Sequence, residues 1–508
     1  MKKKSGKSIS KIRKTGLMVM KSKGYELRGY QKRGVFWMIK RELASQYKGG
    51  ILADDPGLGK TIQTMALIAS QPRKTLIIVP LAVLEQWRVI CTKVFGRKNL
   101  YVHYGYDKFA TKMEIMELEF GICITTHRSS FSPVLQITDF WERIIIDEGH
   151  VIRNNKTGMH KIAVECYSKI SPVNWLLTGT PVQNRFEDIV NLLKFVGINS
   201  KDVRTDPEFY ISSYLLRRTK KVLMDDTFED YEFNTRLVPF STKKEQDLYS
   251  NIETAALEEL ADLKYSGISE AGYNMDILEI IIRIRQASSH PQIALESLRN
   301  KYGLEFNEEF NEVSTKMGRI VSDIQTAEGM SLVFCHFNSE MEILGKLLHK
   351  KDIHFERYKG SMSQREREMT LQKFSDECVY SPKVLLIQIM AGGVGLNLQN
   401  FENVFILSPD WNPTNEIQAI SRAHRFGQKK KVKVNKYLVV YNSEFMEIGG
   451  NIDEKSTTID QRILERQKIK RKLMAKLLKD DTLSFNEKII GETRLNTIRE
   501  SIVSEFPI

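Results

Sequence analysis

The chain has 508 residues, and its 76 lysines and arginines outnumber its 63 aspartates and glutamates to give a formal net charge of +13. This length exceeds what one hydrophobic core usually serves, so we expect two or three domains. No apolar stretch approaches a membrane span, and five scattered cysteines without a C-x-x-C pair argue against a disulfide framework or a zinc module. The excess positive charge favours a polyanionic partner, with nucleic acid the first candidate, and we expect no membrane partner.

The first 23 residues carry nine lysines and arginines and no acidic residue. We therefore expect residues 1–24 to form a basic, disordered arm. A nuclear-import signal or a DNA-contacting tail would have this composition, and so would a plain disordered end. The segment lacks the apolar core of a secretory signal, and the cysteine usage suits a reducing compartment, so we predict an intracellular protein.

Residues 51–61 read ILADDPGLGKT, in which an apolar run opens into a glycine-containing loop. Lys60 and Thr61 then begin a predicted helix. Backbone N–H groups of such a loop, together with a helix N-terminus, form a binding site for a polyphosphate. Lys60 is expected to reach the β- and γ-phosphates of ATP, and the Thr61 hydroxyl is expected to hold Mg²⁺. The nucleotide-contacting residues predicted in this loop are Asp54, Asp55, Pro56, Gly57, Leu58, Gly59, Lys60 and Thr61.

The loop departs from the usual pattern, because Asp54 occupies the position where the pattern begins with glycine. Taken alone, the segment could be a glycine turn that caps a helix. A second motif supports the functional interpretation: residues 144–150 read IIIDEGH, a buried-type strand followed by two acids. Asp147 is expected to hold Mg²⁺ through its water shell, and Glu148 to orient and deprotonate the attacking water.

Short apolar segments alternate with helical patterns in two separate parts of the chain, which predicts parallel α/β architecture. In such sheets ligands bind at the carboxyl ends of the strands, where the polar clusters of this chain lie. The predicted strands lie within 75–80, 121–126, 141–150, 174–184, 331–337, 354–360, 383–389, 402–408 and 433–440. We divide the chain into the arm (1–24), an ATP-binding α/β lobe (25–200), a helical insert (201–312), a second α/β lobe (313–470) and a basic, loosely ordered tail (471–508).

Residues 418–428 read QAISRAHRFGQ and contain two arginines three positions apart. On a helix, Arg422 and Arg425 would share one face. Positive groups of this kind suit the charge that develops on a γ-phosphate during its transfer, which is the role of an arginine finger. The alternative is a solvated basic helix.

Several motifs occur in a fixed order: DDPGLGKT (54–61), DEGH (147–150), LTGTPVQN (177–184), AGGVGLNL (391–398), SPDWNP (408–413) and QAISRAHRFGQ (418–428). Together they resemble the ordered motifs of the superfamily-two nucleic-acid motor ATPases, and specifically the Swi/Snf-type chromatin remodellers and DNA translocases. Further similar segments are LRGYQKRGVFWM (27–38), LLRRTK (215–220), IIRIRQASSHP (281–291), STKM (314–317) and YKGSMSQRER (358–367), so that the resemblance spans about residues 25–470. Stand-alone members of this size include viral proteins described as global transactivators.

The resemblance implies two RecA-like parallel-sheet lobes with helical insertions between and on them, with ATP as ligand and double-stranded DNA as partner. It implies that Gln31 reads the adenine and that Gly395 belongs to the nucleotide site. It also implies that Thr178, Gly179 and Thr180 couple hydrolysis to lobe movement, and that Gly392, Gly393 and Trp411 serve DNA tracking and lobe closure. Nucleosomes or other DNA-bound proteins would be the remodelled partners, in the nucleus or, for a viral protein, the host nucleus.

Four positions depart from the family pattern without removing a catalytic group. Asp55 and Pro56 replace the usual Glu and Met, and Pro56 removes a backbone donor from the loop. His127 stands where the family often has Tyr, and Gly149 replaces the Ala of the Asp-Glu-Ala-His box. The leading hypothesis is an ATP-dependent translocase on duplex DNA. The alternatives are a strand-separating helicase and a DNA-binding transcriptional regulator with little catalysis.

Overall fold

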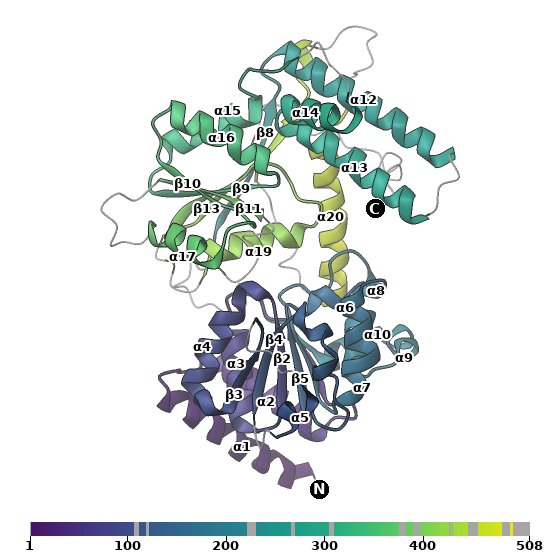
Figure 1. Cartoon of the computed structure of the whole chain (residues 1–508), viewed down its shortest axis with the longest axis vertical. Helices are drawn as coiled ribbons and strands as arrows, with labels where there is room; N and C mark the ends of the chain where they lie inside the picture. Colours follow the sequence, from purple (N-terminus) through teal and green to yellow (C-terminus); the bar gives the residue numbers. More distant parts are fainter. Residues whose placement is uncertain are drawn as a thin grey trace. The chain divides into compact units, whose positions relative to one another are not determined.

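The computed structural model describes residues 2–105, 111–117, 121–220, 230–265, 270–303, 309–374, 383–389, 396, 398–425, 428, 430–445, 456–479 and 488–490. The chain divides into two compact units, the first formed by Met1–Phe228 with Lys472–Leu483 and the second by Glu229–Arg471 with Ser484–Ile508. Each unit contains one parallel sheet covered by helices (Figure 1). The predicted α/β class, with two parallel-sheet lobes, is therefore confirmed.

The sheet of the first unit has the strand order β3-β4-β2-β5-β6-β1-β7, and all of its pairings are parallel. The strands are β1 (Gly49–Leu52), β2 (Thr75–Val79), β3 (Leu100–His103), β4 (Ile122–Thr126), β5 (Arg143–Asp147), β6 (Asn174–Leu177) and β7 (Leu215–Leu216). Because β6 lies between β5 and β1, the loops that follow these three strands meet at one edge of the sheet.

Helices cover both faces of this sheet, as a parallel sheet of continuous apolar strands requires. Every residue of β1, β2 and β4 is buried. The helices of the first unit are α1 (Lys2–Ser22), α2 (Gly29–Ala44), α3 (Lys60–Ser70), α4 (Leu84–Phe95), α5 (Lys112–Met116), α6 (Gly158–Lys161), α7 (Ser168–Ile170), α8 (Phe186–Phe195), α9 (Ser200–Thr205) and α10 (Pro207–Tyr214).

The expectation of a disordered N-terminal arm is wrong for most of its length, because residues Lys2–Ser22 form the helix α1. This helix packs against α3 and α2 (Figure 1). Ile9 and Met20 are buried on its inner side. The high positive charge of this segment favours disorder, but its apolar residues recur at helical spacing, which favours a helix packed on the rest of the unit.

The sheet of the second unit has the order β10-β11-β9-β12-β13-β8-β14, again with parallel pairings. Its strands are β8 (Glu232–Pro239), β9 (Met330–Cys335), β10 (Phe355–Tyr358), β11 (Val384–Gln388), β12 (Phe401–Ile406), β13 (Lys433–Val440) and β14 (Lys488–Ile490). The division of the chain at 200 and 312 differs from the structure. β7, α9 and α10 belong to the first unit, whereas β8 pairs with β13 along eight residues inside the second sheet.

The second unit also carries the helices expected in the insert. They are α12 (Lys243–Tyr265), α13 (Glu270–Ser289) and α14 (Pro291–Tyr302), and α12 and α13 pack on each other. The remaining helices are α15 (Thr315–Thr326), α16 (Asn338–Lys350), α17 (Gln364–Gln372), α19 (Pro413–Ala423) and α20 (Ile459–Leu478), whose last residues, from Lys472, belong to the first unit. Among the described residues, no helix is both long and apolar enough to cross a membrane.

Candidate active site

The loop between β1 and α3 has the backbone conformation that its glycines permit. Gly57 and Gly59 have φ angles of 89° and 79°, in the left-handed region that residues with a Cβ rarely adopt. A Cβ on Gly59 would also lie 2.5 Å from Nε2 of Gln31. The turn therefore needs glycine at Gly59 for both reasons, and α3 begins at the next residue, Lys60.

The side chain of Lys60 folds back onto the start of this loop. Its Nζ donates a hydrogen bond of 2.7 Å to the carbonyl oxygen of Asp54 and a longer one of 3.4 Å to that of Asp55. Burial lowers the pKa of Lys60, and the carboxylates of Glu148, Asp54 and Asp147 oppose that shift. The ammonium group is therefore held among acids from the loops after both β1 and β5.

Asp147 ends β5, and its carboxylate is held from two directions. Oδ2 accepts a 2.9 Å hydrogen bond from Nε1 of Trp87, and Oδ1 accepts one of 2.9 Å from the backbone N–H of Glu148. Burial and the neighbouring Glu148 raise the pKa of Asp147 to about 6. His127 lies on the other side, with Nε2 2.9 Å from the carbonyl oxygen of Asp147. The carboxylate is thus oriented by Trp87 of α4 and by the next residue of the chain, whereas His127 contacts only the backbone of Asp147.

Glu148 has a left-handed backbone with φ 49°, which is uncommon for a residue with a side chain and costs roughly 1–3 kcal/mol. Its Oε2 lies 3.3 Å from Nδ1 of His150. The same nitrogen lies 3.5 Å from Oγ1 of Thr178, which follows β6 and accepts a hydrogen bond from the backbone of Thr180. The structure therefore brings the predicted base, Glu148, and the predicted coupling segment together through His150, a residue to which the sequence assigned no role.

Two arginines that follow β7 hold the phosphate loop in place. Arg217 donates to the carbonyl oxygens of Ala53, at 3.2 Å, and of Gly179, at 3.1 Å. It also forms an ion pair of 3.1 Å with Asp55. One guanidinium group thus joins the phosphate loop to the segment Thr178–Thr180. Both arginines lie in the family-like segment LLRRTK, whose sequence alone suggests no function for them.

Arg218 binds Asp54, the residue that stands where glycine is usual. Nε of Arg218 donates a 2.8 Å hydrogen bond to Oδ1 of Asp54, and Nη2 pairs with Oδ2. Gln63 on α3 donates to Oδ2 at 2.9 Å and accepts from Arg218 at 2.7 Å. Asp54 is fully buried, so its carboxylate is a structural anchor of the loop.

Gln31 of α2 contacts this loop, and Pro56, within the loop, contacts the segment Thr178–Thr180. Nε2 of Gln31 donates to the carbonyl oxygen of Leu58 at 3.1 Å, and the Tyr30 hydroxyl donates to the same oxygen at 3.1 Å. The ring of Pro56 lies against Gly179, where an added Cβ would approach it to 2.9 Å. The adenine-reading role of Gln31 stays a prediction, and its contact with Leu58 gives it a direct link to the loop.

The prediction that Arg422 and Arg425 share one face of a helix is wrong. In the second unit α19 ends at Ala423, and the backbone of Arg425 bonds the carbonyl oxygen of Ala423 in a turn. Arg422 is buried, and its carbonyl oxygen accepts from the backbone N–H of Leu398 at 3.1 Å. Their proposed catalytic role does not depend on the shared face and stays a prediction.

Of the other site residues predicted in the second unit, the structure describes Trp411 but not the three glycines. Trp411 is half-buried against the core that α12 and α13 form, and its carbonyl oxygen accepts from Nζ of Lys470 at 2.9 Å. Gly392, Gly393 and Gly395 lie outside the described residues.

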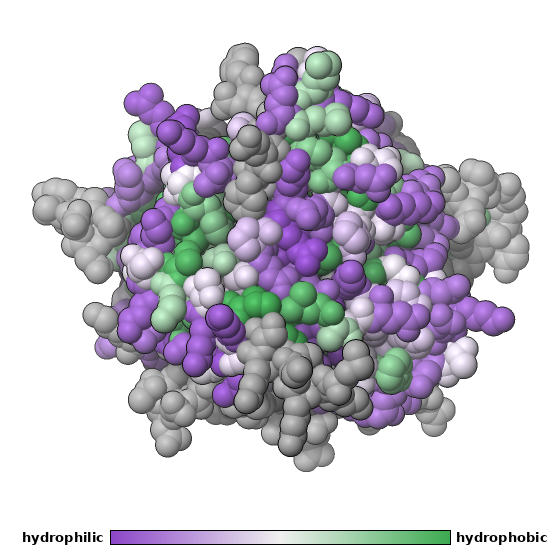
Figure 2. Space-filling model, turned by 90° about the horizontal axis from the view of Figure 1, so that it is seen from below, coloured by the Kyte–Doolittle hydropathy of each residue, from purple (hydrophilic) through white to green (hydrophobic). Residues whose placement is uncertain are grey.

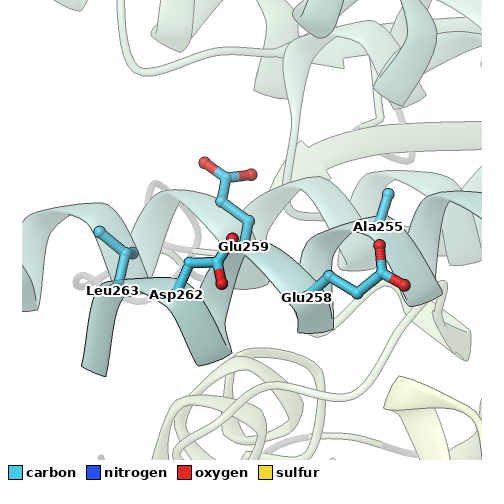
Figure 3. A pocket seen from close by; sticks show the side chains of 5 residues that line it. All are labelled: Ala255, Glu258, Glu259, Asp262 and Leu263. Atoms are coloured by element: carbon cyan, nitrogen blue, oxygen red, sulfur yellow. The ribbon is translucent and has the colours of Figure 1, made fainter. Parts of the chain in front are cut away.

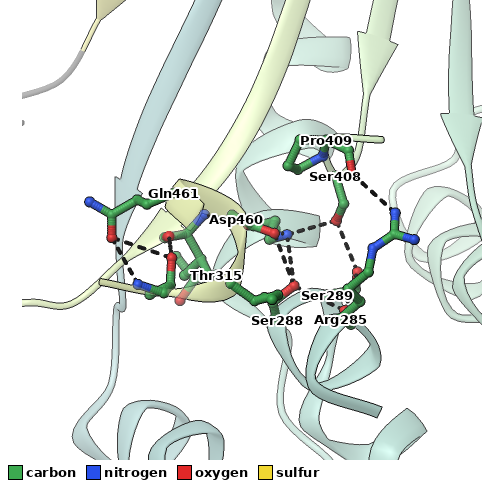
Figure 4. Close-up of polar contacts among 12 residues, drawn as sticks. Arg285, Ser288, Ser289, Thr315, Ser408, Pro409, Asp460 and Gln461 are labelled. Atoms are coloured by element: carbon green, nitrogen blue, oxygen red, sulfur yellow. Dashed lines mark hydrogen bonds and ion pairs between the residues drawn. The ribbon is translucent and has the colours of Figure 1, made fainter. Parts of the chain in front are cut away.

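A buried ionic network lies at the carboxyl end of β12 (Figure 4). Nζ of Lys316 is 2.6 Å from Oδ2 of Asp460 and donates to Oγ of Ser408 at 2.7 Å. Ser289 bonds Ser408 at 3.1 Å, and Arg285 donates to the carbonyl oxygen of Pro409 at 3.0 Å. Each of these side chains has at least one polar partner, although Nε of Arg285 has none among the described residues. The network therefore fixes α13, α15 and the start of α20 around this strand end.

A surface hollow of about 400 Å³ lies on α12, where acidic side chains follow successive turns of the helix (Figure 3). Its lining residues are Ala255, Glu258, Glu259, Asp262 and Leu263. Glu259 forms a 2.6 Å ion pair with Arg283 of α13. An acidic lining repels phosphate groups, so this hollow does not suit a nucleotide.

Two family models match the chain: the SNF2-related domain over residues 30–206 and the helicase conserved C-terminal domain over residues 315–427. Together they cover more than half of the chain, and they lie mainly in the first and second units respectively. The combination defines a helicase-like ATPase. The chain belongs to the SNF2 family.

Among similar proteins is the "Probable global transactivator" of Orgyia pseudotsugata multicapsid polyhedrosis virus, which is 28% identical over 465 residues, covering 86% of this chain and 91% of the viral one. The mouse "SWI/SNF-related matrix-associated actin-dependent regulator of chromatin subfamily A member 1" is 27% identical over 526 residues, covering 95% of this chain but 47% of the mouse protein. A solved structure, "Sulfolobus solfataricus SWI2/SNF2 ATPase core in complex with dsDNA", has 24% identity and a TM-score of 0.37, with 91% of this chain and 93% of that chain covered.

Proposed function

We propose that the chain is a DNA-dependent ATPase that moves along double-stranded DNA and remodels proteins bound to it. The observation that carries the proposal is that Lys60, at the end of the phosphate-binding loop after β1, and Asp147 and Glu148, at the end of β5, lie at the same edge of one parallel sheet, with only β6 between the two strands. A lysine and two acids in this relationship have the chemistry that nucleotide hydrolysis requires.

Within this proposal, each residue of the first unit has a distinct task. Lys60 binds the β- and γ-phosphate oxygens of ATP. Glu148 orients the attacking water and accepts its proton, and His150, close to the Glu148 carboxylate, holds that side chain in position. Thr178 contacts the same histidine, so that a movement of the Glu148 side chain during hydrolysis also moves the segment Thr178–Thr180.

The donor set also fits Mg²⁺, which prefers oxygen ligands and is often held by one or two protein groups together with phosphates and water. The Thr61 hydroxyl and the Asp147 carboxylate would supply these oxygens. The described residues contain no group of three or more His, Cys, Asp or Glu side chains that would hold a metal without a nucleotide. When bound, the ion neutralises charge on the phosphate oxygens. We propose that Arg422 and Arg425 stabilise the charge that develops on the γ-phosphate.

Duplex DNA is proposed as the partner from the net charge of +13, the family and the chromatin regulators among the relatives. Chromatin is nuclear, so we propose the nucleus, or the host nucleus if the chain is viral, as the place of action, and nucleosomes or other DNA-bound proteins as its targets. The viral relative, which has a comparable length, favours a role in transcription.

Displacement of a third strand from a DNA triplex tests translocation without strand separation. ATP-dependent release of the third strand, with the duplex left intact, is the expected result. Separation of the two duplex strands would favour the helicase alternative. DNA binding without ATP turnover would favour the regulator with little catalysis.

A further inference from the structure

The N-terminal helix α1 has two faces of different chemistry. One face contacts the first unit, and the opposite face is exposed and basic. The exposed positions Lys11, Lys14, Met18 and Lys21 recur at helical spacing, whereas Ile9 and Met20 are buried. These two stripes lie on opposite sides of the same helix.

The inner face is closely fitted to α3 and α2. At Gly16 the helices approach so closely that an added Cβ would lie 2.0 Å from Oγ of Ser70 and 2.7 Å from the carbonyl oxygen of Ala66. The guanidinium of Arg13 lies 5.3 Å from the centre of the Phe36 ring, a cation–π contact with α2. α1 is therefore a fixed part of the first unit and packs directly on the helix that begins at Lys60.

The outer face carries only positive charge. No acidic residue occurs in the first 23 positions, which contain nine lysines and arginines. Exposed lysines continue past the helix end at Lys23. Figure 2 views the molecule from the side on which α1 lies in Figure 1 and shows hydrophilic residues interspersed with hydrophobic patches on that face.

We propose that the exposed face of α1, with Lys11, Lys14 and Lys21, together with Lys23 just past the helix end, binds the phosphate backbone of duplex DNA. This inference rests on the proposed function and adds a contact surface outside the motifs of the two lobes. Lysines from position 11 to position 21 span about 15 Å of helix at 1.5 Å per residue. That length matches about four to five base pairs at 3.4 Å each, so several phosphates are within reach.

The packing of α1 distinguishes DNA from an anionic membrane. A basic amphipathic helix binds a membrane by burying its apolar face among the lipids. The apolar face of α1 is already occupied by α3 and α2, and Met20 has no exposed surface. Only the charges remain available, and they suit a polyanion with a regular array of phosphates.

Replacement of Lys11, Lys14, Lys21 and Lys23 together by Gln tests the proposal in the full-length chain. The affinity for a duplex of mixed sequence is measured at several salt concentrations. Each phosphate contact contributes about 0.9 to the slope of log K against log salt, so four contacts predict a decrease of up to about 3.6 in its magnitude. The loss should be similar for different DNA sequences, because backbone contacts carry no base preference.

The matched control replaces Lys98, Lys161, Lys169 and Lys201 by Gln, which removes the same charge from exposed positions elsewhere in the first unit. Its slope should stay closer to that of the wild type. Melting followed by circular dichroism verifies that both variants fold. An unchanged slope in the α1 variant, or an equal decrease in the control, overturns the inference. Loss of binding only to phosphatidylserine vesicles also overturns it. Failure of the wild type to bind duplex DNA at all contradicts the proposed function instead.

Discussion

The guanidinium of Arg218 donates hydrogen bonds to both carboxylate oxygens of Asp54, a residue 164 positions earlier in the chain. Asp54 is fully buried at the first position of the phosphate loop, and only a guanidinium has the planar fork that serves both oxygens at once. Gln63 of α3 bonds both partners. The start of the loop is therefore tied both to the segment after β7 and to α3, and its shape does not rely on glycine at position 54.

Arg218→Ala should strongly destabilise the first unit. The substitution leaves the buried Asp54 carboxylate without its cationic partner, and removal of one member of a buried ion pair costs about 3–5 kcal/mol. We expect the loss in the free energy of unfolding measured by urea denaturation, together with weaker ATP binding.

Arg204→Ala is the matched control, because Arg204 makes the same two-pronged contact with Glu187 on the surface. Solvent screening makes that pair weak, so the control should unfold nearly as the wild type does. Equal stability of the two variants would show that the Arg218 contact does not anchor the loop.

Lys60→Ala and Glu148→Gln should both stop hydrolysis, but at different steps. Loss of the Lys60 ammonium removes a phosphate contact, so nucleotide binding should weaken. Glu148→Gln keeps the size of the side chain and removes its basicity, so ATP should bind while turnover becomes very slow. Equilibrium binding of a fluorescent ATP analogue and steady-state phosphate release separate the two effects. A Glu148→Gln variant with normal turnover would remove Glu148 as the base.

Replacing Arg422 or Arg425 by Ala should leave ATP binding largely intact and stop hydrolysis, even at saturating duplex DNA. An arginine finger contributes roughly 10³–10⁵ in rate. Arg→Lys should restore little, because a point charge lacks the planar guanidinium. Full recovery of turnover at saturating DNA would instead assign these arginines to DNA binding.

The stability of the second unit should fall between pH 7 and pH 5 partly through His290. Its Nδ1 accepts from the backbone N–H of Gln292 at 3.3 Å and caps α14, while Nε2 lies 3.2 Å from the carbonyl oxygen of Glu312. Burial lowers the pKa of His290 to about 4, from an ordinary 6.5. The unfolded chain therefore takes up a proton below pH 6.5 that the folded chain refuses until about pH 4, and stability is lost over that interval.

By pH 5 this single group should reduce the free energy of unfolding by about 2 kcal/mol. His290→Asn keeps a capping oxygen but does not titrate, so its stability should fall less than that of the wild type over the same pH range. The measurement is urea unfolding at pH 7 and pH 5. Parallel losses in the two proteins would contradict the role of His290.

Strong apolar runs made most of the sheet strands predictable, as in β2 and β5, because buried parallel strands have continuous apolar sequences. The four-residue β3 and the two-residue β7 were not predicted. β8 lies in the segment 201–312, for which the sequence predicts helices. Its pairing with β13 joins residues about 200 positions apart, which local patterns do not encode.

The phosphate loop and the Asp147–Glu148 pair could be predicted because each is a short, contiguous motif. Arg217 and Arg218 could not, because their contacts exist only once β7 pairs with β1. Arg425 shows the opposite error. The spacing of Arg422 and Arg425 predicts a shared helix face, but α19 ends at Ala423, two residues before Arg425. The exact end of a helix is the feature of a helix that is hardest to predict.

We propose that ATP hydrolysis by this chain is driven by duplex DNA. The most direct test is the steady-state ATPase rate of the full-length wild type with duplex DNA, with single-stranded DNA and with none, and Glu148→Gln as the inactive reference. We predict the highest rate with the duplex, a lower rate with single strands and the lowest without DNA. A rate that DNA does not change, or that single strands raise more than the duplex does, would contradict the account.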